Sequence, residues 1–464
     1  MDVKNKRVLV VGLGKSGIAS ALFLADRGAR VAVSDTKSAE ELHHEIPQLL
    51  DHGIVVEAGY HGERTFKEQE LIVISPGVPA DVPQLVQARQ AGIAVIGEIE
   101  LAARFLKGQI VAITGSNGKT TTTAMAGEII AASGSKTLVG GNIGTPAISF
   151  VASATDDTWI VLEVSSFQLE TIETFHSKIA VVLNVTPDHL DRHHTFANYA
   201  AAKLRIFENQ TSSDFAVLNA DDTNCVAMAD KTKAALYWFS RQREVEHGAF
   251  LRGDNIIWRD ADREKAILDV AEISLKGAHN VENVLAGVCA GMLAGVDPAD
   301  IRRAVANFKA VEHRLEYVAT IRGVQYYNDS KATNVDATIK ALESFPGGIH
   351  LILGGKDKGS DYTVLNPMLE KRVKRVYTIG AAAKKIESQV KGTQVVSATT
   401  IDNAVRRASE SATPGDIVLL APACASFDQF VSYEHRGRVF KDLVRQMEAR
   451  EVQPTGSGRA GGKK

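Results

Sequence analysis

The chain has 464 residues, which is long for one hydrophobic core and predicts about three domains. Its 45% hydrophobic and 23% charged residues are ordinary for a globular protein, and its net charge of −2 argues against nucleic-acid or membrane binding driven by bulk charge. The cysteines, Cys225, Cys289 and Cys424, are widely separated, so we expect neither a disulfide framework nor a cysteine metal site. The chain starts directly with a predicted strand, and its longest apolar helical stretch, 284–296, is too short for a bilayer, so we expect a cytoplasmic protein.

The first predicted strand, Arg7–Val11, runs into Gly-Leu-Gly-Lys-Ser-Gly at 12–17 and then into an Ala/Leu-rich helix. A second strand ends at Asp35, close to the spacing expected of an acid that binds a ribose. This fingerprint predicts a Rossmann-type dinucleotide site, although any nucleotide diphosphate could use the same turn. The strand Leu71–Ile74 is followed by a rigid Ser-Pro-Gly-Val-Pro turn at 75–79. Its place at the carboxyl end of a strand favours a binding site over simple chain reversal.

A second region is predicted to begin near residues 97–108, before an apolar run that leads into Gly-Ser-Asn-Gly-Lys-Thr at 115–120. Where a strand leads through a short turn into a helix, several backbone N–H groups point toward one position. Such an arrangement can bind a polyphosphate. Lys119 can neutralise the β- and γ-phosphates and Thr120 can hold Mg²⁺, whereas Ile113 replaces the first glycine of a full P-loop. The alternative is a glycine-rich turn with an incidental lysine. We expect ATP to bind this phosphate loop through Gly115, Ser116, Asn117, Gly118, Lys119, Thr120 and Thr121.

Beyond the loop, strands alternate with helices, which predicts a parallel sheet covered on both faces. A flexible turn is expected at 140–144. Glu163 ends a buried strand, where it is a candidate Mg²⁺ ligand or, equally, a carboxylate paired with a lysine. The stretch 184–194 contains Asp188, His189, Asp191, His193 and His194, which resemble a metal site by composition, but we expect only one or two of them to be functional. Periodicity alone would place Lys203, on a helix at 196–208, in solvent.

Residues 236–276 predict a small antiparallel excursion, followed by a buried helix that begins near His279. A boundary is expected near 308–311. The last region repeats the alternation of strands and helices, and polar, glycine-containing loops follow its strands where an open sheet binds ligands. The chain has no repeat of fixed period. The predicted domains are 1–97, 98–310 and 311–452, with a disordered tail at 453–464.

Two nucleotide-type sites in one chain indicate two nucleotides, one that supplies energy and one that serves as a substrate handle. No Cys or Ser nucleophile with a paired base stands out. Phosphoryl activation of the substrate is therefore the more economical mechanism.

The assembled segments resemble the Mur ligases of peptidoglycan synthesis, from about residue 6 to about residue 449. The motifs that carry this resemblance are Thr-Gly-Ser-Asn-Gly-Lys-Thr (114–120), Glu-Val-Ser-Ser-Phe-Gln-Leu-Glu (163–170), Asn-Val-Thr-Pro-Asp-His-Leu-Asp-Arg (184–192), Ala-Lys-Leu-Arg-Ile-Phe (202–207), His-Asn-x-x-Asn (279–283), Glu-His-Arg (312–314), Asn-Asp-Ser-Lys-Ala-Thr-Asn (328–334) and Pro-Ala-Cys-Ala-Ser-Phe-Asp-Gln-Phe (422–430).

The resemblance implies an α/β chain of three domains: a Rossmann-like UDP-sugar domain, a central P-loop-type ATPase domain and a C-terminal Rossmann-like domain. It implies an ATP-dependent amide ligase that adds D-glutamate to UDP-N-acetylmuramoyl-L-alanine through an acyl phosphate and releases ADP and phosphate. Such an enzyme serves cell-wall synthesis, and with it cell shape and division. The implied cofactors are ATP and one or two Mg²⁺ ions, with Mn²⁺ as a substitute. We expect a monomer with no nucleic-acid or membrane partner, whose domains close to bring Arg314, Lys358 and the acyl phosphate together and to exclude water.

The resemblance also implies roles for single residues. The catalytic set is Lys119, His189, Lys203 and Arg314. The metal ligands are Thr120, Glu163, His189 and Lys203. Further ATP contacts are Asn280, Asn283, Arg314 and Asp329. The UDP-sugar contacts are Lys15, Ser16, Asp35, Thr36, Lys37, Ser75, Pro76, Gly77, Asn142 and His189. The D-glutamate contacts are Lys331, Thr333, Lys358, Ser426 and Tyr433.

Three of these positions differ from a simple expectation. The family carries the lysine at 203 as a carbamate, whose oxygens suit Mg²⁺ where an ammonium would be repelled, and this replaces the solvent-facing interpretation. Lys37 stands where some relatives carry arginine, and a lysine ammonium does not make the bidentate phosphate contact of a guanidinium. Tyr433 stands where phenylalanine is common.

The nearest alternative is a sister Mur ligase that adds L-alanine, a diamino acid or a dipeptide. The Ser-Ser-Phe-Gln stretch and the loop of Lys358 favour D-glutamate. A folylpolyglutamate-type ligase should lack the first domain. A non-catalytic nucleotide-sensing or redox protein is disfavoured by the presence of Lys119, Glu163, His189 and Lys203.

Overall fold

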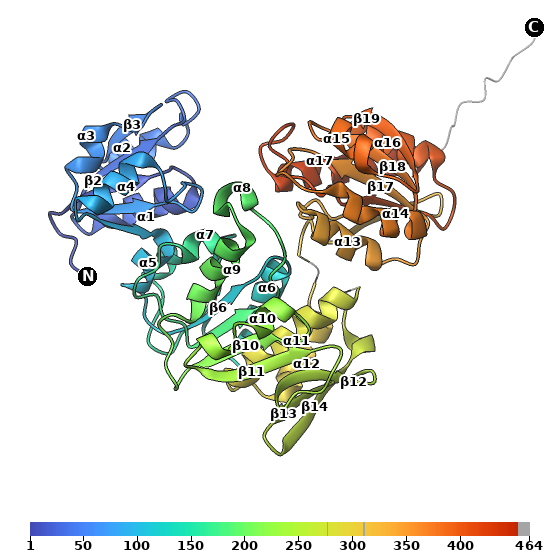
Figure 1. The fold of residues 1–464 in the computed structure, drawn as a ribbon, viewed down its shortest axis with the longest axis horizontal. Helices are drawn as coiled ribbons and strands as arrows, with labels where there is room; N and C mark the ends of the chain where they lie inside the picture. The colour runs from blue at the N-terminus through green and yellow to red at the C-terminus, as the bar shows by residue number, and fades with distance from the viewer. Residues whose placement is uncertain (276, 310, 453–464) are drawn as a thin grey trace, which may run out of the picture. The chain divides into compact units, whose positions relative to one another are not determined.

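Each of the three predicted α/β regions holds one sheet in the computed structural model, which describes residues 1–275, 277–309 and 311–452 (Figure 1). The predicted tail and one position of the second boundary lie outside the described residues. By their contacts the residues form two compact units, one of Met1–Ser274 with Asn280–Phe308 and the other of Leu275–His279 with the chain from Lys309. The first unit contains the first two sheets and the second unit contains the third.

The first sheet has five parallel strands in the order β3-β2-β1-β4-β5. Alternate residues of β1 fall into two hydrophobic clusters, with Val8 and Val10 in one and Leu9 and Val11 in the other, so both faces of the sheet are buried. The strands are β1 (Arg7–Val11), β2 (Arg30–Asp35), β3 (Val55–Ala58), β4 (Leu71–Ile74) and β5 (Ala94–Gly97). The helices are α1 (Lys15–Asp26), α2 (Ile46–Asp51), α3 (Glu63–Lys67) and α4 (Pro83–Gln90).

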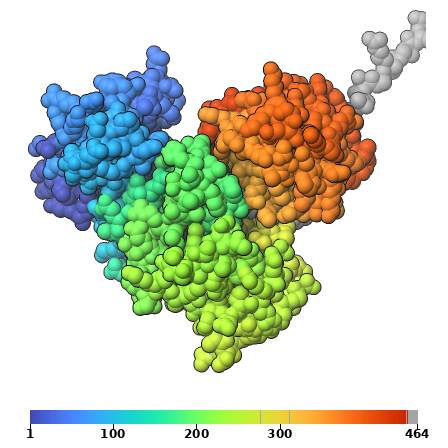
Figure 2. Space-filling model, viewed as in Figure 1, coloured from blue at the N-terminus to red at the C-terminus, as the bar shows by residue number. Residues whose placement is uncertain are grey.

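The second sheet has nine strands in the order β14-β13-β12-β11-β10-β9-β6-β8-β7. It is parallel except for the antiparallel pairs β12–β13 and β13–β14, which confirm the excursion predicted at 236–276 and form a narrow lobe (yellow-green in Figure 2). The strands are β6 (Gln109–Thr114), β7 (Thr137–Gly141), β8 (Trp159–Glu163), β9 (Ile179–Val182), β10 (Phe215–Asn219), β11 (Ala235–Ser240), β12 (His247–Arg252), β13 (Asn255–Asp260) and β14 (Arg263–Asp269). The helices are α5 (Glu98–Ala103), α6 (Lys119–Ala132), α7 (Ser166–Leu169), α8 (Leu190–His193), α9 (Phe196–Leu204), α10 (Thr223–Val226), α11 (Ala278–Leu293) and α12 (Pro298–Asn307).

Two predicted segments need correction. Gly140 and Gly141, expected in a flexible turn, end strand β7, where they pair with β8. The sequence analysis missed the end of this strand because two consecutive glycines normally indicate a turn and lower strand propensity. The helix expected over 196–208 is α9 followed by a 3₁₀ turn at Arg205–Phe207.

The third sheet has six strands in the order β15-β16-β20-β17-β18-β19, and only its edge strand β15 is antiparallel. Its two faces also contribute to separate hydrophobic clusters, with Leu351 and Leu419 in one and Ile352 and Val418 in the other. The strands are β15 (Glu316–Ile321), β16 (Val324–Asn328), β17 (Ile349–Gly354), β18 (Val373–Ile379), β19 (Gln394–Thr399) and β20 (Ile417–Leu420). The helices are α13 (Val335–Glu343), α14 (Asn366–Arg372), α15 (Ala383–Gln389), α16 (Ile401–Ser411) and α17 (Tyr433–Val452).

Helix α5 connects the first sheet region to the second. The buried carboxylate of Glu98 accepts a hydrogen bond from the N–H of Ile148 at 2.8 Å. Glu100, also buried, accepts from the backbone N–H groups of Glu173, Thr174 and Phe175 at 2.8 to 3.0 Å. Helix α5, which directly follows the last strand of the first sheet, is therefore held to the second sheet region by buried hydrogen bonds.

Among the described residues, no helix is both long enough and apolar enough to cross a membrane.

Candidate functional site

The predicted phosphate loop lies between β6 and the 14-residue helix α6, and β6 is an interior strand of the second sheet, between β9 and β8. Gly118 precedes the helix with φ of 85°, and a Cβ there would lie 2.3 Å from the side-chain oxygen of Asn283. A left-handed backbone and this close contact both require glycine. The ammonium of Lys119 donates to the carbonyls of Gly115 at 2.8 Å and Ser116 at 2.9 Å, so the lysine folds over its own loop. A helix N-terminus with an ammonium beside it suits a phosphate.

The carboxylate of Glu163 lies beside Thr120, although 43 residues separate them. The neighbouring strands β6 and β8 explain this, because their carboxyl ends meet at one edge of the sheet. The Thr120 hydroxyl donates to Glu163 Oε2 at 2.8 Å, and the Asn142 amide donates to Oε1 at 3.0 Å. Glu163 is buried. A buried hydroxyl and carboxylate next to a phosphate loop form a donor set that fits Mg²⁺, a hard cation that prefers oxygen.

Lys203 is 1% exposed, which corrects the solvent-facing position that periodicity predicted. Its ammonium donates to the Gly115 carbonyl at 2.8 Å and lies 4.6 Å from the centre of the Tyr199 ring. Burial lowers the pKa of Lys203 well below its usual range, and the nearby charge of Lys119 lowers it further. The neutral amine that this favours is the form that reacts with carbon dioxide to give a carbamate, so the environment suits the predicted modification.

The loop after β9 separates the histidines that composition had grouped together. His189 has φ of 53°, and its ring meets that of Phe167 edge to face at 4.9 Å. His193 is buried and its ring stacks on that of Phe167 at 5.2 Å, whereas His194 is exposed near Asp81. Of these rings, that of His189 remains a candidate for a ligand.

Ser166, His193 and Glu170 form a series of contacts that the sequence did not reveal. His193 Nε2 lies 2.9 Å from Ser166 Oγ, and its Nδ1 lies 3.1 Å from Glu170 Oε1. The order matches a serine–histidine–acid relay. Because Ser166 is only 3% exposed, the series fixes the loop instead of presenting a nucleophile.

Asn280 and Asn283, on the first turns of α11, lie beside the phosphate loop. Asn283 Oδ1 accepts from the Thr122 hydroxyl at 3.2 Å, and the Asn283 amide donates to Asn280 Oδ1 at 3.0 Å. Thr121 is buried on the same helix as Thr122. Of these two expected ATP contacts, Asn283 bonds directly to helix α6, which follows the phosphate loop, and Asn280 bonds to Asn283.

In the first domain, the predicted sugar-nucleotide residues surround the carboxyl ends of β1, β2 and β4. Asp35 accepts from the N–H groups of Leu13 at 2.6 Å and Lys37 at 2.8 Å, so its carboxylate ties two loops together. The Ser75 hydroxyl donates to the Gly12 carbonyl at 2.7 Å. The remaining predicted residues of this domain lie at the surface, partly or fully exposed: Lys15, Ser16, Thr36, Lys37, Pro76 and Gly77.

Two glycines of the first fingerprint differ in their surroundings. A Cβ on Gly17 would lie 1.9 Å from the Gly12 carbonyl oxygen, whereas a Cβ on Gly14 would meet nothing within 4 Å. Close packing of α1 on β1 therefore requires Gly17, and the protein itself places no steric demand on position 14.

In the second unit, the predicted residues follow β16, β17 and β20, which are neighbours in the sheet. Asp329 follows β16, and Ser426 follows β20; both are buried. The ammonium of Lys331 lies 3.8 Å from the centre of the Tyr433 ring, a cation–π contact that tyrosine supports as well as phenylalanine. Thr333 donates its N–H to the Lys331 carbonyl, and Lys358 is half-buried in the loop after β17. Apart from Tyr433, which begins helix α17, these residues lie in the loops that follow the carboxyl ends of neighbouring strands of one sheet.

Arg436 is a buried residue of this region that the sequence analysis missed. Its guanidinium donates to Ser330 Oγ at 3.0 Å, to the Ser330 carbonyl at 2.8 Å and to the Cys424 carbonyl at 3.1 Å. It thus ties the loop after β16 to the loop after β20. No periodic signal separated it from the exposed Arg438 two residues later.

Glu312, His313 and Glu316 place potential metal-ligand atoms within 4.8 Å of one another. Lys441 donates to the carboxylates of Glu312 at 2.5 Å and Glu316 at 2.8 Å. Its ammonium supplies the positive charge that these carboxylates need, which favours an ion-pair cluster over a metal centre.

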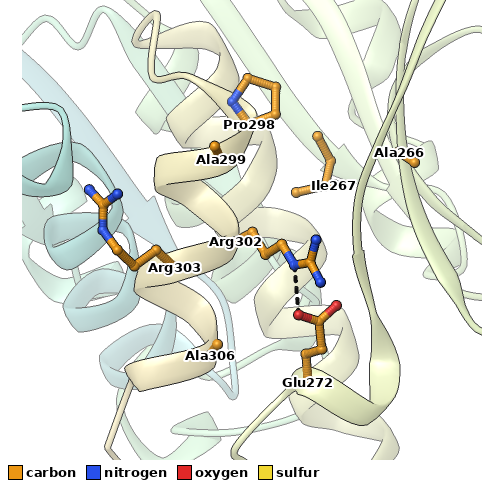
Figure 3. Close-up of a pocket in the computed structure, with 8 residues that line it drawn as sticks. All are labelled: Ala266, Ile267, Glu272, Pro298, Ala299, Arg302, Arg303 and Ala306. Atoms are coloured by element: carbon orange, nitrogen blue, oxygen red, sulfur yellow. Dashed lines mark hydrogen bonds and ion pairs between the residues drawn. The ribbon is translucent and has the colours of Figure 1, made fainter.

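A hollow of about 450 Å³ lies between β14 and α12 (Figure 3). Arg302 projects into it and pairs with Glu272 at 2.6 Å, while Arg303 pairs with Asp300. Its lining includes none of the predicted site residues.

Burial gives Asp329 a pH-dependent effect on folding. Burial raises the pKa of the Asp329 carboxyl group to about 7, although the nearby charge of Arg314 acts to lower it. The folded protein therefore binds the carboxyl proton more tightly than the unfolded chain does. The cost of ionising Asp329 is absent below its unfolded pKa and grows as the pH rises to about 7. Asp329→Asn should therefore stabilise the protein more at pH 8 than at pH 5, measured as the difference in denaturant midpoint from wild type.

Asp357→Asn is the matched control in the same unit. Burial by itself would raise the pKa of Asp357, but hydrogen bonds from Lys385 and Tyr362 outweigh this effect and lower the pKa. That carboxylate is ionised at both pH values, so the stability change should be the same at pH 5 and pH 8. An equal effect of Asp329→Asn at both values would contradict the raised pKa.

Three family models match this chain. They are the Mur ligase MurD-like N-terminal domain over residues 6–97, the Mur ligase middle domain over 113–291 and the Mur ligase glutamate ligase domain over 313–424.

Curated relatives match over almost the whole chain. A protein of Koribacter versatilis named UDP-N-acetylmuramoylalanine–D-glutamate ligase is 68% identical over 97% of this chain and 100% of its own length. A protein of the same name from Acidobacterium capsulatum is 60% identical over 96% of this chain and 97% of its own.

Solved structures share the fold at low identity. A pseudomurein peptide ligase type C from Methanothermus fervidus has a TM-score of 0.62 at 19% identity, covering 96% of this chain and 100% of that one. A UDP-N-acetylmuramate-alanine ligase, MurC, from Thermotoga maritima has a TM-score of 0.59 at 19% identity, covering 95% and 99%. These neighbours agree with three α/β domains.

Proposed function

The chain belongs to the Mur ligase family, and on that premise we propose that it joins D-glutamate to UDP-N-acetylmuramoyl-L-alanine, with conversion of ATP to ADP and phosphate. The observation that carries this proposal is the 68% identity, over 97% of the chain, to a relative named for that ligation. The reaction belongs to peptidoglycan synthesis, and through it to cell shape and division. We propose that the enzyme acts in the cytoplasm as a monomer.

The phosphate loop is proposed to hold the triphosphate of ATP, with the Lys119 ammonium released from its backbone carbonyls to the phosphates. Mg²⁺, or Mn²⁺ in its place, would be held by Thr120, Glu163, His189 and a carbamate on Lys203. When bound, such ions would supply positive charge that offsets the charge of the phosphates. The γ-phosphoryl group is proposed to pass to the substrate carboxylate, which gives an acyl phosphate and ADP. Asn142 keeps the Glu163 carboxylate oriented by donating to its second oxygen.

The acyl phosphate formed in this way is attacked by the amine of D-glutamate, and phosphate leaves from the tetrahedral intermediate. The UDP-sugar is assigned to the loops that contain Ser16, Asp35 and Ser75. Arg314 and Asp329 are assigned to the phosphates and ribose of ATP. Lys331 and Lys358 can each pair with a carboxylate of D-glutamate. The residues assigned to D-glutamate are Lys331, Thr333, Lys358, Ser426 and Tyr433.

Release of phosphate from ATP tests this proposal. The assay contains UDP-N-acetylmuramoyl-L-alanine and, in parallel, D-glutamate, L-alanine, meso-diaminopimelate or no amino acid. We expect turnover with D-glutamate to exceed that with each other amine by about a hundredfold or more, since the charged partners for a second carboxylate would be left unpaired by L-alanine. Turnover with a diamino acid but not with D-glutamate would assign the chain to a sister activity. No turnover under any condition would favour a non-catalytic nucleotide-binding protein.

A further inference from the structure

Arg192 joins the first two domains through both arms of its guanidinium. Its Nη1 donates to the carbonyl of Pro76 at 2.8 Å, and its Nη2 donates to the carbonyl of Val78 at 2.8 Å. These carbonyls belong to the turn after β4, more than a hundred residues earlier in the chain. The side chain is 15% exposed, so the two bonds are largely shielded from water. A planar fork suits two carbonyls of one turn better than a single ammonium does.

The other side of Arg192 contacts the segment that holds His189. The guanidinium carbon lies 4.1 Å from the centre of the Phe167 ring, and Nη2 lies 3.6 Å from Glu170 Oε2. Phe167 in turn meets the His189 ring at 4.9 Å, and Glu170 holds His193 at 3.1 Å. One side chain therefore connects the turn after β4 with the ring packing around His189.

Each end of this connection belongs to a different part of the substrate site. The turn after β4 contains Ser75, Pro76 and Gly77, which are assigned to the sugar nucleotide. His189 belongs to the proposed metal ligands and to the catalytic set, where the substrate carboxylate accepts the γ-phosphoryl group. UDP-N-acetylmuramoyl-L-alanine carries its nucleotide at one end and its reacting carboxylate at the other. A fixed separation between the two protein segments would therefore place that carboxylate reproducibly, and small misplacement of reacting groups is costly.

We propose that Arg192 is a positioning residue that sets the separation between the sugar-nucleotide turn and the His189 loop. The inference rests on the proposed function. It requires no contact between Arg192 and substrate, since the guanidinium acts through the Pro76 and Val78 carbonyls on one side and through Phe167 on the other.

The test compares Arg192→Ala and Arg192→Lys with a matched control, Arg89→Ala. Arg89 also donates to a carbonyl of this segment, that of Ala80 at 2.5 Å, but from α4 of the same domain. The measurements are the Kd for UDP-N-acetylmuramoyl-L-alanine by calorimetry without ATP, kcat, the KM for ATP, and the thermal unfolding midpoint.

We expect Arg192→Ala to raise the Kd for the UDP-sugar and to lower kcat, each by about tenfold to hundredfold, since two hydrogen bonds from a charged group are lost. The KM for ATP should stay within about twofold, because the phosphate loop keeps its own contacts. The Kd and kcat of Arg192→Lys should lie between those of wild type and Arg192→Ala, since an ammonium can donate to the same carbonyls but lacks the planar fork of the guanidinium. Arg89→Ala removes a positive charge that interacts with Glu170, but its hydrogen bond lies within its own domain, so this variant should match wild type in all kinetic measurements.

A lower unfolding midpoint with unchanged Kd and kcat at 25 °C would overturn the inference and leave Arg192 with a purely structural role. A parallel rise in the KM for ATP would also overturn it, because the whole site would then be disturbed. If Arg192→Ala does not fold, an Arg192→Lys variant with wild-type Kd and kcat would overturn the inference in its place. If the proposed function were wrong, the wild-type protein itself would show no turnover. That result is distinguishable from a failure of the Arg192 inference, in which wild type is active.

Discussion

Lys203→Ala should lose at least about a thousandfold in the rate of phosphate release, the largest effect expected of any single substitution in this protein. The lysine is buried beside the phosphate loop, and its depressed pKa favours the neutral amine that forms a carbamate. Alanine lacks the amine on which the proposed carbamate would form, so it removes the proposed oxygen ligands as well. Steady-state kinetics with all three substrates measures the loss.

Added short carboxylates, such as acetate or formate, should restore part of the activity of Lys203→Ala by occupying the position of the carbamate. Lys178→Ala is the control, since this partly exposed lysine next to β9 pairs with Asp214 away from the loop. It should keep wild-type activity and show no response to carboxylates. In wild type, ¹³C-labelled bicarbonate should produce a carbamate signal by NMR that the Lys203→Ala variant lacks. A fully active Lys203→Ala enzyme would refute the carbamate.

Glu163→Gln should lower kcat by about a hundredfold to a thousandfold and raise the Mg²⁺ concentration needed for half-maximal activity. Glutamine keeps the shape of the side chain and an oxygen for the Asn142 amide, but it removes the charge that a divalent cation needs. A titration with Mg²⁺ at saturating ATP separates weaker metal binding from slower chemistry.

Glu128→Gln is the control for Glu163→Gln, because Glu128 lies on α6, the helix of Thr120, but is exposed. Its Mg²⁺ dependence should equal that of wild type. A Glu163→Gln enzyme with an unchanged Mg²⁺ dependence would remove Glu163 from the proposed ligands and return it to a structural role in holding Thr120 and Asn142.

Local patterns predicted the parts of the site in which neighbouring residues act together. The phosphate loop is such a case, since Gly118, Lys119 and Thr120 are consecutive and the strand and helix around them follow from apolar periodicity. The three sheets and the antiparallel excursion near residue 250 were predictable for the same reason.

Functions that depend on distant partners were not predictable from such patterns. Lys203 is polar and lies on a helix, so periodicity placed it in solvent, whereas its ammonium donates to the carbonyl of Gly115, 88 residues earlier in the chain. Arg192 and Arg436 look like surface arginines in sequence, because their acceptors are backbone carbonyls of remote loops. Every residue has a backbone carbonyl, so residue types do not indicate which carbonyl a distant side chain will bind.

The unequal surroundings of Gly14 and Gly17 have a consequence for how this protein can change over generations. Gly17 is retained by the packing of its own helix, whatever the protein binds, whereas only a ligand lying against the loop would select against a side chain at position 14. Lineages that lost sugar-nucleotide binding would be free to exchange Gly14 first while Gly17 and Gly118 persisted. Substitutions of Gly14 would therefore indicate that substrate recognition has been lost while the fold is still intact.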